Sequence, residues 1–120
     1  MKKLLFAFFV LAISSQVFAE ITVKQVLGDW TYNVNTDQGA LTGVIKITEK
    51  EGKLAANIYS DDGNTFPVSK IEIKEGDILY FELVPDYEVI KVSVKIDGKK
   101  FTGTVGTDEG SMPITGAKKE

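Results

Sequence analysis

The segment IKVSVKIDGKKFTGTV, residues 90–105, carries the clearest structural signal in this chain. Apolar residues alternate with polar residues on both sides of the pair Asp97-Gly98. Alternation with a period of two residues is typical of a β-strand with one buried face, and Asp-Gly is a preferred hairpin turn. The segment therefore predicts two antiparallel strands that bury a common apolar face.

The same alternation continues in both directions from this hairpin. Turn signals rich in Gly, Asp or Asn recur at 37–39, 50–52, 61–64, 75–77 and 108–110, and Pro85 makes a further break. These divisions predict about eight strands. Outside the hairpin, the positions expected to face inward are Trp30, Tyr32, Val34, Gly43, Ile45, Ile47, Leu54, Ala56, Ile58, Phe66, Val68, Leu79, Phe81, Leu83, Met112 and Ile114.

An internal repeat indicates how the strands are connected. Residues 54–63, LAANIYSDDG, match residues 101–110, FTGTVGTDEG, at an offset of 47 positions. Two copies of a four-stranded meander explain this match, since short connections favour hairpins. Joined edge to edge, they predict an all-β fold: an eight-stranded antiparallel up-and-down barrel, without exposed sheet edges. A two-sheet sandwich stays open as the alternative.

Two details complete the predicted fold. Residues 21–27 lack the alternation, and Thr22 can cap a short N-terminal helical turn there. The face opposite the apolar stripe carries Lys, Thr, Ser and Asn, whereas a membrane-spanning barrel needs an apolar outer face. We therefore expect a water-soluble barrel.

The N-terminus reads as a cleavable export signal. Lys2 and Lys3 precede an apolar run over 4–13, and Val17-Phe18-Ala19 has small or short residues at the two positions that a signal peptidase reads. The apolar run is too short for a transmembrane helix, which needs about 20 residues. We expect residues 1–19 to be a signal peptide, and residues 20–120 to be one domain located in the periplasm or outside the cell.

The composition excludes several classes of function. Cleavage removes two of the 14 basic residues, all of them Lys, and leaves 12 against 17 acidic residues, a net charge of −5. Such a chain is poorly suited to nucleic acid or to anionic membranes. There is no His and no Cys, so the usual catalytic bases, thiol nucleophiles and zinc ligands are missing. We expect no catalytic site, no cofactor and no metal; the acidic stretch at Asp61-Asp62 is explained by a turn.

A resemblance supports the barrel. The motif Gly28-Asp29-Trp30 follows the predicted helical turn, and 52–54 (GKL), 102–105 (TGTV) and Pro113 come later. This layout resembles small exported lipocalin-like (calycin-like) β-barrel domains, a family largely of unassigned function. The resemblance implies a binding role. In lipocalins a late Arg packs over the Trp; this chain has no Arg, and Lys118 is only a loose substitute.

Binding is the function these observations favour. Trp30, Tyr32, Phe81 and Phe101 are the candidate ligand-binding residues, since they would line the interior of the barrel. The ligand would be a small apolar or amphipathic molecule, or a glycan. Gly43, Ala56 and Gly103 leave interior space, which could instead be filled by the large side chains. The alternative function is docking of a secreted protein, or inhibition of an enzyme, through three tyrosines expected on the surface: Tyr59, Tyr80 and Tyr87.

Overall fold

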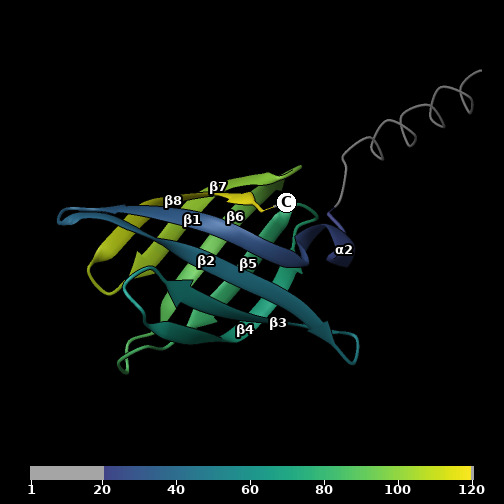
Figure 1. Cartoon of the computed structure of the whole chain (residues 1–120), viewed down its shortest axis with the longest axis horizontal. Helices are drawn as coiled ribbons and strands as arrows, with labels where there is room; N and C mark the ends of the chain where they lie inside the picture. Colours follow the sequence, from purple (N-terminus) through teal and green to yellow (C-terminus); the bar gives the residue numbers. More distant parts are fainter. Residues whose placement is uncertain (1–20, 120) are drawn as a thin grey trace, which may run out of the picture.

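The computed structural model describes residues 21–119, which form one closed β-barrel (Figure 1). The predicted signal peptide lies outside the described residues. The barrel has eight antiparallel strands in sequence order, preceded by a short helix. The elements are α2 (Val23–Val26), β1 (Gly28–Thr36), β2 (Gly39–Lys50), β3 (Lys53–Ser60), β4 (Thr65–Lys74), β5 (Ile78–Leu83), β6 (Ile90–Asp97), β7 (Lys100–Thr107) and β8 (Gly110–Lys118).

Pairing of the first and last strands closes the sheet. β1 pairs with β8 from Trp30 opposite Lys118 to Val34 opposite Ile114, while its other edge pairs with β2. The predicted up-and-down barrel is therefore confirmed, and the sandwich alternative is wrong because hydrogen bonds run around the whole circle of strands. The repeat is visible in the bounds of β3 and β7, whose first and last residues each differ by 47.

The predicted helical turn is also confirmed. Thr22 is its N-cap: its hydroxyl accepts a hydrogen bond from the Gln25 backbone N–H, and the Gln25 side chain accepts one from the Thr22 backbone N–H. This capping box positions a four-residue helix whose Val26 is fully buried. Within residues 21–119, no helix is long and apolar enough to cross a membrane.

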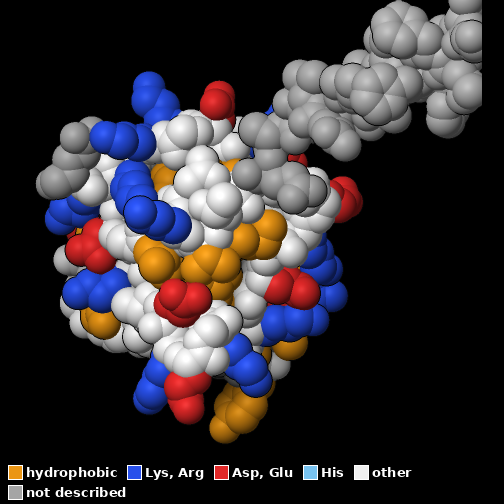
Figure 2. All heavy atoms as spheres, turned by 90° about the vertical axis from the view of Figure 1, so that its right-hand side faces the viewer, with side chains coloured by type: hydrophobic (Ala, Val, Ile, Leu, Met, Phe, Trp, Pro, Cys, Tyr) orange, Lys and Arg blue, Asp and Glu red, His pale blue; other side chains and the backbone are white. Residues whose placement is uncertain are grey.

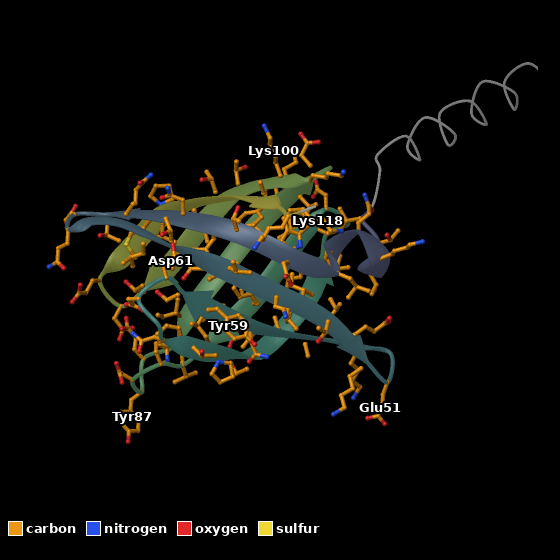
Figure 3. All side chains as sticks on the ribbon, viewed as in Figure 1. Glu51, Tyr59, Asp61, Tyr87, Lys100 and Lys118 are labelled. Atoms are coloured by element: carbon orange, nitrogen blue, oxygen red, sulfur yellow. The ribbon has the colours of Figure 1, made fainter. Side chains whose placement is uncertain are left out.

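The barrel has two different ends. The helix end carries α2 and the turns at 51–52, 75–77 and 98–99, while the loop end carries the turns at 37–38, 61–64, 84–89 and 108–109. In Figure 3, Glu51 lies at the tip of a turn at the helix end, and Tyr87 lies in a turn at the loop end. Core residues such as Trp30, Phe101 and Val94 occupy the helix half.

The inward glycines serve a purpose other than the one expected from the sequence. A Cβ at Gly43 would lie 2.2 Å from the Tyr59 carbonyl oxygen, and one at Gly103 would lie 1.9 Å from the Ser93 carbonyl oxygen. The neighbouring backbone therefore occupies the space that a side chain would need. We correct the expectation that these glycines leave interior space: they allow the close strand approach of a strongly coiled sheet.

Candidate functional site

The interior of the barrel is hollow at the loop end. A cavity of about 160 Å³ lies there, and all eight strands contribute side chains to its wall. None of the lining residues is charged, and only two carry a hydroxyl group. The lining residues are Tyr32, Val34, Leu41, Ile45, Ile58, Phe66, Phe81, Leu83, Ile90, Val92, Val105, Thr107, Met112 and Ile114.

The helix end, in contrast, is filled by aromatic packing. The rings of Trp30 and Phe101 lie 5.6 Å apart, and both side chains are almost completely buried. The Trp30 indole N–H donates a hydrogen bond of 2.9 Å to the Val26 carbonyl, which ties the helix to the barrel. Because α2 and these rings close one end, any ligand must enter from the other.

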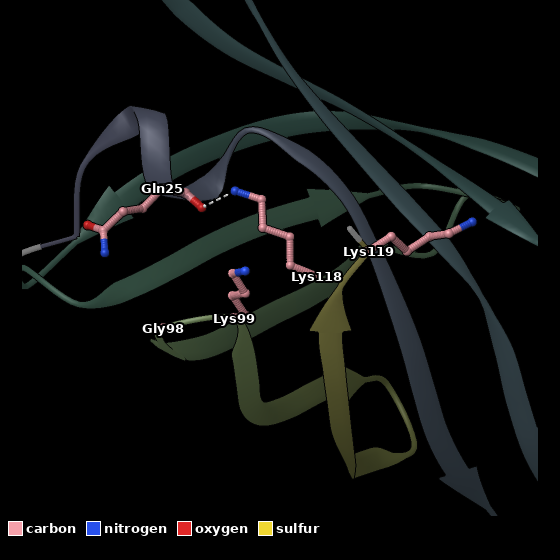
Figure 4. Close-up of a pocket in the computed structure, with 5 residues that line it drawn as sticks. All are labelled: Gln25, Gly98, Lys99, Lys118 and Lys119. Carbon is pink, nitrogen blue, oxygen red and sulfur yellow. Dashed lines mark hydrogen bonds between the residues drawn. The ribbon is translucent and has the colours of Figure 1, made fainter.

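Lys118 completes this closure. Its Nζ lies 5.7 Å from the centre of the Trp30 ring and donates a hydrogen bond of 3.0 Å to the Gln25 carbonyl (Figure 4). A cation over an indole face is attracted by the ring electrons, and here it also satisfies a carbonyl of the helix. The loose substitute identified in the sequence thus takes the position over the Trp that the lipocalin resemblance implied for an Arg.

The four candidate residues divide between the two ends. Tyr32 and Phe81 line the cavity, whereas Trp30 and Phe101 belong to the packed helix end and do not line it. The sequence left open whether the barrel is filled or hollow, and the structure shows that it is filled at one end and hollow at the other. Period-two alternation gives the face of each residue but not its depth along the barrel axis.

Most residues of the cavity wall were expected to face inward but were not among the four candidate ligand-binding residues. Phe66, Leu83, Ile90 and Met112 all line the cavity close to the loop-end turns. Leu41 lines it as well although 54% of its surface is exposed, so Leu41 stands at the cavity mouth. Their distance along the sequence from a turn could have identified them, because each of these side chains lies within a few residues of a loop-end turn.

Acidic side chains surround the mouth. Each of the loop-end turns carries at least one carboxylate, and none carries a Lys. We call this group the acidic rim; it consists of Asp37, Asp61, Asp62, Asp86, Glu88, Asp108 and Glu109. The helix end is different, since Figure 2 shows Lys and acidic side chains mixed there around a group of hydrophobic ones.

Hydrogen bonds hold parts of the rim in place. Glu88 accepts a hydrogen bond of 2.8 Å from the Asp108 backbone N–H, which links the third loop-end turn to the fourth. Asp61 accepts one of 2.6 Å from the Thr42 hydroxyl. The backbone N–H of Asn64 stabilises the charged form of Asp62 and so lowers the pKa of that carboxyl.

Tyr32 connects the rim to the cavity. Burial raises the pKa of its phenol above the ordinary value of 10.0, and the Asp61 and Asp62 carboxylates add to the increase. The group therefore stays protonated at neutral pH. The Ser60 side chain is a hydrogen-bond partner of this hydroxyl, which lies in a largely apolar wall.

The outer tyrosines do not form a common binding surface. The Tyr80 hydroxyl donates a hydrogen bond to Glu82, and Lys74 Nζ lies 4.3 Å from the centre of its ring. Tyr59 and Tyr87 are exposed, but Figure 3 shows them apart, on the side of the barrel and at the tip of a loop. Among residues 21–119, aromatic side chains come together in the interior of the barrel.

The remaining features offer little chemistry. No buried polar or charged side chain and no metal-binding group of acidic residues occurs among residues 21–119. A surface hollow of about 380 Å³ at the helix end is lined by Gln25, Gly98, Lys99, Lys118 and Lys119 (Figure 4). Lys118 is already engaged there by Gln25 and Trp30.

Several solved structures resemble this barrel. A redesigned β-barrel matches with a TM-score of 0.67 at 16% identity, over 82% of this chain and 95% of that one. A second redesigned barrel, bound to DFHBI, matches with a TM-score of 0.60 at 16% identity, over 81% of this chain and 97% of that one. A Schistosoma mansoni fatty acid binding protein in complex with arachidonic acid matches with a TM-score of 0.59 at 13% identity, over 83% of this chain and 100% of that one.

These similarities establish the fold. Two fatty-acid-binding proteins, from Echinococcus granulosus and Schistosoma mansoni, are among the similar structures, and at 15% and 13% identity the likeness concerns the fold alone. No family model matches the sequence, and no curated protein matches it. The narrower resemblance to exported lipocalin-like domains stays a prediction.

Proposed function

We propose that this protein binds a small, mainly apolar molecule in the loop end of its barrel and performs no reaction on it. The cavity carries this proposal, because all eight strands contribute to its wall and no charged residue lines it. Concave apolar sites with a few polar groups are typical of ligand pockets. Similar barrels hold arachidonic acid in one solved structure and DFHBI in another, which supports the proposal.

The size of the cavity limits the ligand. An engineered apolar cavity of about 150 Å³ in another protein accommodates benzene, and the cavity here measures about 160 Å³. One aromatic ring or a short alkyl chain therefore fills it, and each buried methylene group contributes about 0.8 kcal/mol. A glycan fits poorly, since its hydroxyl groups would lose water and find only the Tyr32 and Thr107 hydroxyls.

The residues of the cavity wall support a binding role without catalysis. The cavity wall offers no carboxylate, amine, thiol or imidazole as a catalytic acid, base or nucleophile. The Tyr32 phenol, whose pKa burial raises, is a hydrogen-bond donor at neutral pH and not a base. The acidic rim faces water outside the apolar wall.

Calorimetric titration with 1-octanol tests the proposal. Val105→Phe places an aromatic ring in the cavity, whereas Thr104→Phe places the same ring on the exposed face of the same strand, β7. We expect the wild type and Thr104→Phe to bind octanol with similar affinity, and Val105→Phe to bind at least tenfold more weakly. Thermal unfolding checks that both variants are folded. Equal binding by all three proteins would contradict the cavity site.

We further propose that the protein acts outside the cytoplasm. Lys2, Lys3, the apolar run over 4–13 and the Val17-Phe18-Ala19 motif support export. The intact mass of the protein from its own host tests this directly. We expect a chain that begins at Glu20; a protein that retains residues 1–19 would contradict cleavage.

A further inference from the structure

A second hollow adjoins the cavity at its mouth. This vestibule has a volume of about 310 Å³ and lies between the turns that join β1 to β2 and β7 to β8. Thr107 and Met112 line both the vestibule and the cavity, so the two spaces are neighbours that share these side chains as walls. Together they form a site with an apolar inner part and a polar outer part.

The vestibule is acidic. Asp37 enters it from one turn and Glu109 from the other, and its remaining lining is uncharged. The ion pairs among residues 21–119 join Glu72 to Lys70 and Lys74, and Asp77 to Lys95, so none involves the acidic rim. None of these ion pairs between described residues therefore neutralises a rim carboxylate.

This arrangement selects by charge. A carboxylate at the mouth would meet the acidic rim, and neither the cavity nor the vestibule offers it a Lys or Arg partner. A cation at the same position would be attracted, and low-dielectric walls strengthen such fields within a concave site. The mouth therefore disfavours a fatty-acid anion, the kind of ligand bound by a protein of similar fold.

We propose that the ligand is a small cationic amphiphile, with its apolar part in the cavity and its ammonium group in the vestibule beside Asp37 and Glu109. This inference rests on the proposed function and adds the chemical class of the ligand. The barrel supplies apolar burial, and the vestibule supplies the preference for a positive charge.

Three compounds with the same alkyl chain test the inference: octylamine, 1-octanol and octanoate, titrated by calorimetry at pH 7 in low salt. We expect octylamine to bind about five- to tenfold more tightly than octanol, and octanoate to bind more weakly than octanol. Because the rim is exposed to solvent, the advantage of octylamine should shrink in about 0.5 M salt, while octanol binding should not weaken.

A charge-matched pair of variants locates the effect. Asp37→Asn combined with Glu109→Gln removes both vestibule carboxylates, whereas Glu49→Gln combined with Glu51→Gln removes two exposed carboxylates at the helix end. We expect the first pair to abolish most of the preference for octylamine and to leave octanol binding unchanged. The second pair should retain the preference.

The outcomes separate the two proposals. If octanol binds but octanoate binds as tightly as octylamine, or if the vestibule variant retains the full preference, the cationic ligand class is wrong and the cavity site stands. If none of the three compounds binds, the cavity site itself is wrong, and the inference falls with it.

Discussion

Replacing Trp30 with alanine should destabilise the barrel from its helix end. The Trp30 side chain is only 1% exposed, packs against Phe101 at 5.6 Å and bonds the Val26 carbonyl through its indole N–H. Lys118 covers its ring. One substitution therefore removes an aromatic contact, a hydrogen bond and the surface on which Lys118 rests.

The magnitude follows from the burial. Truncating a buried Trp or Phe to Ala costs about 3–5 kcal/mol, and we expect the free energy of unfolding to fall within that range. In a domain of about 100 residues this corresponds to a decrease in Tm of at least about 12 °C. Trp30→Phe keeps a ring but leaves the Val26 carbonyl without its donor, at a cost of about 1–3 kcal/mol.

Urea unfolding followed by far-UV circular dichroism measures both variants. Fluorescence is unsuitable because Trp30 is the single Trp of the chain. Tyr87→Ala serves as the control, since Tyr87 is fully exposed and should cost less than about 0.5 kcal/mol. A loss below 1 kcal/mol for Trp30→Ala would refute the assignment of Trp30 as the closure of the helix end.

Three further predictions concern the sheet and its surface. Gly103→Ala should lower the Tm by several degrees, because the added Cβ would lie 1.9 Å from a backbone atom of the neighbouring strand. Gly106→Ala should be tolerated, because the atom nearest to its added Cβ would lie 3.6 Å away. A calorimetric scan compares the Tm of the two variants. Glu82→Gln should lower the pKa of Tyr80 from about 12 toward 10.0, since the hydrogen bond to Glu82 is the main cause of the increase; phenolate absorbance against pH measures it. Tyr87→Gly should raise stability or leave it unchanged, because Tyr87 has φ +67°; a decrease in urea midpoint would contradict this.

Most of the strand pattern could be predicted from the sequence because most strands obey one local rule, the alternation of inward and outward residues; β4 departs from it at a register shift between Val68 and Lys70. Ile90 to Ile96 alternate with polar residues, Gly-containing turns end the strands, and the repeat implied a closed meander. The same rule assigned Trp30 and Phe101 correctly to the interior. Alternation and turns depend on residues that are close in sequence, so one sequence was enough to predict them.

The position of the cavity could not be predicted in this way. Whether an inward residue lines a cavity or fills the core depends on what lies opposite it across the barrel, and alternation contains no such information. Tyr32 and Trp30 are two residues apart on one strand, yet only Tyr32 lines the cavity. Gly103 was misread because alternation does not show how closely the backbone of the neighbouring strand β6 approaches it.

Native mass spectrometry of the protein purified from its own host is the most direct test of whether the barrel binds a small molecule. The mass is measured under native conditions and again after unfolding. We expect a small molecule that is retained in the native state, lost on unfolding, and absent from Val105→Phe prepared in the same way. A bare native mass, together with no binding of added 1-octanol, would contradict a ligand-binding barrel.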